Sequence, residues 1–168
     1  MVYFPDACIV RKVVYIILTM EDDHIYKSHN KSLLLYHLVF PAKYRRKVFS
    51  ESVENTLRDV CIGISERYEI RFIEIGVDED HVHFLVQSVP SISITQLVKT
   101  IKSITARQLF RTHPEIKQML WGGNLWTSGY YVNTVGQYAS RDVIEKYVAG
   151  QGQYKKLYTS QLVFDFGM

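Results

Sequence analysis

The chain has 168 residues, 47% of them hydrophobic and 22% charged, with a formal net charge of +3. This length suits one domain with a sizeable core, and the ordinary composition excludes a low-complexity or disordered chain. No segment reaches the ~18 consecutive apolar residues of a membrane span. The apolar run at 13–20 is followed by acidic residues rather than a small-residue cleavage site, so we expect no signal peptide.

The two cysteines, Cys8 and Cys61, match no metal-binding spacing. We therefore expect reduced thiols in a cytoplasmic protein. Residues 1–24 match no clear element. We expect an N-terminal extension there, followed by a domain at 25–151 and a C-terminal tail at 152–168.

The first half of that domain contains a strand, a helix and a hairpin. The apolar run 33–40 predicts a strand that is buried on both faces. Apolar side chains recur at helical spacing over 51–67, after Ser50 as a candidate N-cap. Residues 68–77 then predict a second strand, which a polar turn joins to a third strand at 81–89. On the second strand the alternation places Ile70, Phe72 and Glu74 on one face.

The second half adds two helices and a strand. Ser91 or Ser93 precedes a long helical pattern at 94–111, and a Gly-rich aromatic loop, a strand and a last helix follow at 121–126, 129–135 and 141–151. The order strand, helix, strand, strand, helix, strand is the βαββαβ pattern of a ferredoxin-like fold. We therefore predict an α+β protein with an antiparallel sheet, helices on one sheet face, and the first and third strands in its middle.

The third strand carries two histidines at alternate positions. Side chains at i and i+2 of a strand share one face, so His81 and His83 project side by side, opposite Val82 and Phe84. Two imidazoles at this spacing can share a divalent cation. By spacing alone, two polar residues on a solvated sheet face are roughly twice as common an explanation.

The last predicted helix offers a third ligand and a nucleophile. Tyr147 and Gln151 are four residues apart and share a helical face. The Gln151 carbonyl could complete the metal site, and the Tyr147 phenol could then attack a phosphorus atom that the metal polarises. The same spacing has a purely structural explanation, in which Tyr147 packs against Val143 and Gln151 is a polar residue near the end of the helix.

Basic residues gather in two stretches. Residues 27–47 contain six Lys or Arg and no Asp or Glu, and residues 99–117 contain five against Glu115 alone. Clustered charge of this kind suits a phosphate backbone, although two solvated faces would look the same. The candidate DNA-binding residues are Lys43, Arg45, Arg46, Lys47, Lys99, Lys102, Arg107 and Arg111.

Seven short motifs resemble, in their order along the chain, the single-tyrosine HUH transposases (TnpA-type) of the smallest bacterial and archaeal insertion sequences. The resemblance covers residues 26–151. The motifs are His-Asn-Lys-Ser (29–32), Tyr-His-Leu-Val-Phe (36–40), Lys-Tyr-Arg-Arg-Lys (43–47), Asp-His-Val-His-Phe-Leu (80–85), Leu-Trp-Gly-Gly-Asn-Leu-Trp (120–126), Gly-Tyr-Tyr (129–131) and Lys-Tyr-x-x-x-Gln (146–151).

The resemblance implies a DNA transposase that cleaves and rejoins single strands at hairpin-bearing element ends through a 5′-phosphotyrosine. His81, His83 and Gln151 would bind Mg²⁺ or Mn²⁺, and Tyr147 would be the nucleophile. The resemblance also implies a homodimer in which the tyrosine helix of one subunit reaches the histidine pair of the other.

Three alternatives compete with the transposase. Relatives adapted by their host keep these motifs while cutting chromosomal repeats. A non-catalytic RNA- or single-strand-binding module would share the ferredoxin-like pattern, but it needs exposed aromatic residues on its central strands, and the third strand offers His81, His83, Leu85 and Gln87 instead. A structural zinc protein would need four nitrogen or sulfur ligands, which the cysteine spacing does not supply.

Overall fold

The computed structural model describes residues 24–136, which fall into two compact units, 24–33 and 34–136. The first unit is a short antiparallel hairpin of β1 (Ile25–Lys27) and β2 (Asn30–Ser32). Within it the Lys31 ammonium lies 4.8 Å from the centroid of the Tyr26 ring. The sequence analysis did not predict this hairpin, because its short polar strands lack a hydrophobic alternation.

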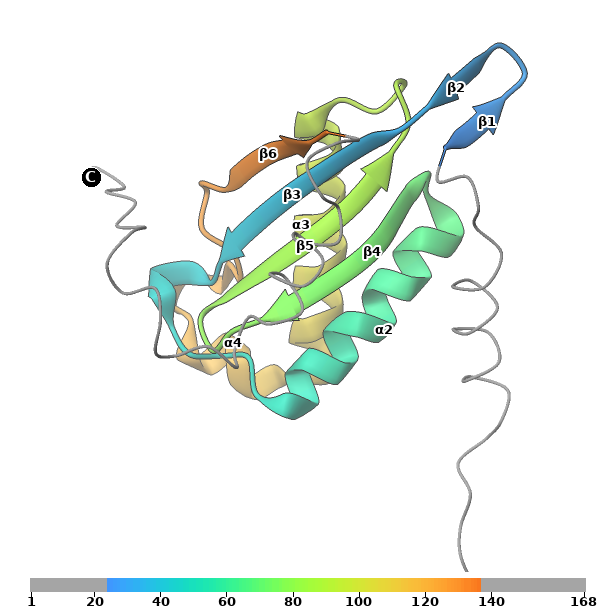
Figure 1. Cartoon of the computed structure of the whole chain (residues 1–168). Coiled ribbons are helices and arrows are strands. Elements are labelled where there is room, and N and C mark those ends of the chain that lie inside the picture. The colour runs from blue at the N-terminus through green and yellow to red at the C-terminus, as the bar shows by residue number, and fades with distance from the viewer. Residues whose placement is uncertain (1–23, 137–168) are drawn as a thin grey trace, which may run out of the picture. The chain divides into compact units, whose positions relative to one another are not determined.

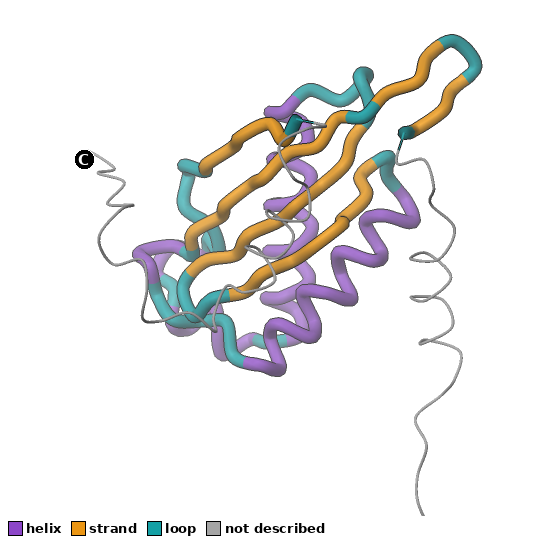
Figure 2. Tube along the Cα trace, in the orientation of Figure 1, coloured by secondary structure: helices purple, strands orange, loops and turns teal. Residues whose placement is uncertain are grey.

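The second unit is built on a four-stranded antiparallel sheet with the strand order β4-β5-β3-β6. Its strands are β3 (Leu34–Pro41), β4 (Ile70–Val77), β5 (His81–Ser88) and β6 (Tyr131–Val135). Figure 2 shows them as one orange layer. The first and third of these strands are central, which confirms the predicted ferredoxin-like order.

Two long helices lie on the same side of this sheet (Figure 1): α2 (Glu51–Arg67) and α3 (Ile94–Thr112). The Ser93 hydroxyl caps α3 by accepting a hydrogen bond from the Gln96 backbone N–H at 3.2 Å. Ser50 stands at the N-cap of α2, but its side chain makes no capping hydrogen bond. A short helix that the sequence analysis missed, α4 (Pro114–Met119), begins at a proline, a residue favoured in the first helical turn.

The hydrophobic core fills the space between the sheet and the two long helices. Leu38 and Phe40 of β3 and Val82, Phe84 and Val86 of β5 belong to it and are fully buried. Because side chains alternate along a strand, His81, His83 and Leu85 face the opposite side of the sheet. The helices therefore cover one face, and the histidine pair belongs to the other.

The predicted alternation along β4 is interrupted. The pairing with β5 shifts between Phe72 and Glu74, as in a β-bulge that gives Ile73 no paired partner. After the shift Ile75 takes a core position, so Glu74 does not share the face of Phe72. The bulge returns the apolar side chain of Ile75 to the core and interrupts the strand pairing locally. A strict alternation counted from residue 70 does not predict such an interruption.

Hydrogen bonds join the Gly-rich loop after α4 to α3 and to the segment that follows β3. It includes the 3₁₀ turn η2 (Trp121–Gly123), in which Gly122 and Gly123 adopt φ values of +81° and +68°. The Trp126 indole N–H donates to the buried Thr105 hydroxyl of α3 at 3.0 Å. The Lys43 backbone N–H donates to the Leu125 carbonyl at 2.7 Å, which holds the chain after β3 beside the loop.

No helix within residues 24–136 has the length and hydropathy that a membrane crossing needs. The predicted helix at 141–151, with Tyr147 and Gln151, lies outside the described residues, as do the extension before residue 24 and the tail.

Candidate metal centre and DNA interface

The two histidines of β5 lie side by side on the sheet face opposite the helices. The centroids of the His81 and His83 rings are 5.0 Å apart, and the ring planes are inclined by 61°. His83 is buried, with 5% of its surface exposed, whereas 18% of the His81 side chain is accessible. The His83 imidazole therefore lies in the protein interior, and the His81 imidazole beside it is partly accessible to solvent.

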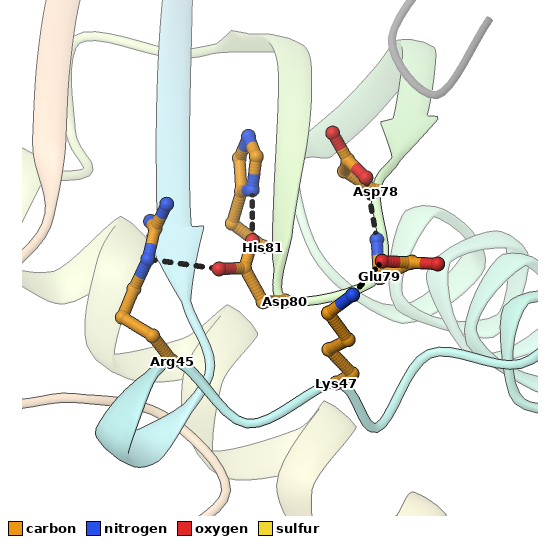
Figure 3. A network of polar contacts seen from close by, with 6 residues as sticks. All are labelled: Arg45, Lys47, Asp78, Glu79, Asp80 and His81. Carbon is orange, nitrogen blue, oxygen red and sulfur yellow. Dashed lines mark hydrogen bonds and ion pairs between the residues drawn. The ribbon is translucent and has the colours of Figure 1, made fainter. Parts of the chain in front are cut away.

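His81 is oriented by a carboxylate. Its Nδ1 lies 2.6 Å from Oδ1 of Asp80, whose Oδ2 accepts from the Arg45 guanidinium Nε at 3.0 Å (Figure 3). A proton on Nδ1 that is shared with a carboxylate leaves the ring lone pair on Nε2. Nε2 is thus the nitrogen through which His81 can bind a metal, an arrangement common among metal-binding histidines.

Arg45 reaches Asp80 because the chain turns sharply after β3. The turn is the 3₁₀ segment η1 (Lys43–Arg45), in which Tyr44 and Arg45 have φ values of +59° and +53°. Non-glycine residues seldom adopt such angles, and local strain of this kind gathers at functional sites. A second ion pair ties the same segment to the turn before His81: the Lys47 ammonium lies 2.8 Å from Oε2 of Glu79 (Figure 3).

His83 pairs with a histidine of the neighbouring strand. Its Nδ1 lies 2.9 Å from Nε2 of His37 on β3, and the two rings are stacked with their centroids 5.2 Å apart. Burial, followed by the charges of His81, His37 and Arg45, lowers the pKa of His83 to about 3. Burial also lowers the pKa of His37. Both imidazoles are neutral near pH 7, which is the form that binds metals.

The described residues include two candidate metal ligands, His81 and His83. Among residues 24–136, no three His, Cys, Asp or Glu side chains come together in a group that could hold a metal ion. His81 and His83 fit a divalent cation by their donor chemistry, but a further ligand is required. Gln151, the ligand that the sequence predicts, lies outside the described residues, and its role stays a prediction, as does that of Tyr147.

The basic residues fall into two groups with different surroundings. Residues 43–47 adjoin the histidine pair through the Arg45–Asp80 ion pair, and Arg45, Arg46 and Lys47 are exposed. Lys99, Arg107 and Arg111 are exposed on α3, which belongs to the helix layer behind the sheet in Figure 1. The first group is therefore better placed to hold DNA at the candidate metal centre.

Lys102 differs from the other basic residues of α3. Its ammonium donates to the backbone carbonyls of Thr127, Ser128 and Gly129 at 2.9, 3.4 and 2.7 Å. It also lies 5.1 Å from the centroid of the Phe40 ring. Burial lowers the pKa of Lys102 to about 8, so the ammonium is still mostly charged at neutral pH. Lys102 thus holds the loop at 127–129 against α3, unlike the other basic residues of this helix.

Comparison with known proteins identifies the family. The family model described as "Transposase IS200 like" matches residues 30–151. The chain belongs to the IS200-like transposase family. Its members are DNA-cleaving and DNA-rejoining enzymes, and the matched range includes every site residue discussed above.

Individual relatives of this IS200-like transposase agree with the assignment. The ISDra2 transposase TnpA of Deinococcus radiodurans is 34% identical over 143 residues, which cover 83% of this chain and 97% of that protein. The IS200 transposase of Salmonella typhimurium is 26% identical over 77% of this chain and 84% of its own. Both are similar over most of their length.

Two solved structures resemble the transposase fold described here. A crystal structure of a putative transposase from Deinococcus radiodurans superposes with a TM-score of 0.62 at 33% identity, over 76% of this chain and 98% of that one. A REP-associated tyrosine transposase bound to a REP hairpin superposes with a TM-score of 0.52 at 11% identity, over 74% and 69% of the two chains. The second likeness shows the fold alone.

Sequence reasoning on this transposase missed the residues that support the histidine pair. His37 and Asp80 lie within the motifs at 36–40 and 80–85, but the sequence analysis assigned neither of them a role at the site. The alternation of side chains along β3 could have indicated His37. Leu38 and Phe40 are core residues, so His37 must face the other side of the sheet. Recognising that His37 meets His83 also requires the register, in which Val39 pairs with His83.

Proposed function

We propose that this transposase cuts one strand of DNA with Tyr147 as the nucleophile, beside a divalent cation held by His81 and His83. The observation that carries the proposal is the histidine pair itself. Each Nδ1 makes a hydrogen bond, to Asp80 or to His37, so both rings can direct Nε2 to a common cation. Family membership supports the reaction class.

In the proposed step the Tyr147 oxygen attacks a phosphorus atom of the DNA backbone. The bond between phosphorus and the 3′ oxygen breaks, the phenol loses its proton, and the departing oxygen takes up a proton to become a 3′-OH. The DNA strand that begins at that phosphate stays attached as a 5′-phosphotyrosine. Attack by a 3′-OH on this linkage reverses the step and rejoins DNA, so a single tyrosine serves both reactions.

His81, His83 and Gln151 are the proposed ligands of Mg²⁺ or Mn²⁺. The carboxamide and phosphate oxygens are hard ligands that suit these ions, whereas the imidazoles favour Mn²⁺ over Mg²⁺. When bound, the cation would polarise the phosphate and neutralise the charge that develops on it. The protein's own part is to hold the two rings by Asp80 and His37 and to keep His83 neutral.

We further propose that the DNA is a single strand folded into a hairpin at the element end. A protein of the same fold, the REP-associated tyrosine transposase, is bound to a REP hairpin in its solved structure, and we extend this kind of ligand to the present chain. Arg46 is an exposed cation on the segment that also supplies Arg45 to the metal centre. Phosphates held there would lie at the same sheet end as His81.

A homodimer with sites shared between subunits remains part of the proposal. Gly136 precedes the predicted helix at 141–151 and permits backbone angles that other residues avoid, so the helix could dock on its own sheet or on that of the partner. Sharing would couple cutting to assembly, because no complete site exists in a single subunit.

A host-adapted nuclease acting on chromosomal repeats is the second candidate. It would use the same residues, so the site does not separate the two. The 26% identical relative is named as the transposase of an insertion sequence element, whereas the REP-associated neighbour is only 11% identical, and this difference favours the mobile-element role.

The test uses the full chain and end-labelled DNA from the regions that flank its gene, supplied as single strands and as duplex. We expect cleavage of the single strands only, with Mg²⁺ or Mn²⁺ and not with EDTA. His81→Ala should abolish cleavage while hairpin binding stays nearly intact. Full cleavage by that variant, or equal cleavage of the duplex, would refute the proposal.

A further inference from the structure

The hydrogen bond between the imidazoles of His37 and His83 connects the two central strands beside the metal centre. His37 pairs with Leu85 and Val39 pairs with His83, so His37 and His83 are diagonal neighbours on one sheet face. Their rings are nearly parallel, inclined by only 18°, and the two nitrogens are 2.9 Å apart. The Tyr131 ring packs edge-on against the His37 ring, with the two ring centroids 5.9 Å apart. The backbone ladder and these ring contacts fix the position of His37.

A hydrogen bond between two neutral imidazoles has a direction, because one nitrogen must donate and the other must accept. If His37 donated from Nε2, His83 would accept at Nδ1 and carry its own proton on Nε2. Neither nitrogen of His83 would then offer a lone pair to a metal. If His83 donates from Nδ1 instead, its Nε2 has a lone pair. Only the second direction is compatible with His83 as a ligand.

We propose that His37 is a positioning residue that accepts a hydrogen bond from Nδ1–H of His83 and thereby holds the Nε2 lone pair of His83 ready for a divalent cation. This inference rests on the metal assignment made above and extends it. Partners of this kind commonly fix the tautomer and the ring orientation of metal-binding histidines.

His37 acts through His83 and not as a ligand. The nitrogen that it turns toward the site, Nε2, is the one bonded to His83, and the described residues contain no grouping of three His, Cys, Asp or Glu suited to a metal. The two ligands thus have different partners: the accessible His81 has the Asp80 carboxylate, and the buried His83 has a neutral ring. A carboxylate beside the buried His83 would lose far more hydration than an imidazole does.

Two substitutions separate the hydrogen bond from the packing. His37→Phe keeps a ring of similar shape and removes the acceptor, whereas His37→Gln keeps an acceptor at a similar reach. The first measurement is the imidazole ¹⁵N chemical shifts of metal-free, ¹⁵N-histidine-labelled full-length protein. We expect the His83 proton on Nδ1 in wild type and in His37→Gln, and a mixture of tautomers in His37→Phe.

The second measurement is Mn²⁺ binding, followed by the EPR signal of the free ion. Loss of such a partner typically weakens metal binding by roughly 10- to 100-fold. We expect that loss for His37→Phe and a smaller one for His37→Gln. A His83 proton on Nε2 in wild type, or unchanged Mn²⁺ affinity in His37→Phe, would overturn the role of His37. Unchanged Mn²⁺ affinity in His83→Ala would instead refute the metal assignment, which the NMR measurement does not depend on.

Discussion

Acid should destabilise this transposase through His83. The pKa of His83 is lowered to about 3 in the folded protein, against an ordinary value of 6.5. The unfolded chain therefore takes up a proton at this residue as the pH falls below 6.5, while the folded chain does not until about pH 3. The stability that the neutral ring provides is complete above pH 6.5 and is lost progressively below it.

The size of this effect follows from the two pKa values. Between pH 7 and pH 5 the unfolded state gains about 2 kcal/mol from protonating His83, since one pH unit is worth about 1.4 kcal/mol once the pH is below the unfolded pKa. At pH 5 the folded protein binds almost no proton at His83, because this pH is well above the pKa of His83 in the folded state. His37, with a pKa also lowered by burial, adds a contribution of the same sign.

The assay is urea unfolding in EDTA at pH 7, 6 and 5. We expect the free energy of unfolding of wild type to fall more steeply than that of His83→Gln, with the difference growing to about 2 kcal/mol at pH 5. His29→Gln removes an imidazole from an exposed position of the β1–β2 hairpin and serves as the matched control. Parallel curves for wild type and His83→Gln would refute the reasoning.

Three further predictions follow from the structure and the proposed site. Lys102→Met should lower the free energy of unfolding by about 2 kcal/mol, since it removes charged hydrogen bonds to three carbonyls, whereas Lys99→Met should change it by less than about 0.5 kcal/mol, as measured by denaturant unfolding. Hairpin affinity should fall steeply with salt, and Arg46→Gln should reduce the logarithmic salt slope by about 0.7; an unchanged slope would remove Arg46 from the interface. Tyr147→Phe and His81→Ala should each be inactive, yet regain partial cleavage when mixed under verified subunit exchange; no recovery would exclude shared sites at the cleavage step.

Much of the fold could be predicted because its elements have strong periodic patterns. The helix predicted at 51–67 has the bounds of α2, and the strand predicted at 81–89 is β5 with one residue fewer. Alternation along β5 placed His81 and His83 on one face without any knowledge of the partner strands. Where the pattern was short or interrupted, as in the β1–β2 hairpin and at the bulge near Ile73, the sequence was insufficient.

The support of the candidate site could not be predicted in the same way, because it depends on contacts distant in the chain. His37 and His83 are 46 residues apart and meet only through the register of β3 with β5. Arg45 reaches Asp80 because Tyr44 and Arg45 both have positive φ values. The conformational preferences of tyrosine and arginine do not predict such a turn. Lys102 was a candidate DNA-binding residue because it belongs to a basic stretch, but its partners lie on a loop beyond the next helix.

The most direct test of the central claim is to locate the covalent DNA linkage by mass spectrometry. Trypsin cleaves after Lys146 and Lys155, so the peptide 147–155 contains both Tyr147 and Tyr154. After reaction with single-stranded hairpin DNA and nuclease trimming, fragmentation of this peptide should place a 5′-phosphate nucleotide on Tyr147. Tyr147→Phe should abolish the adduct, and Tyr154→Phe should not. Cleavage without an adduct, or an adduct on another residue, would contradict the proposed role of Tyr147.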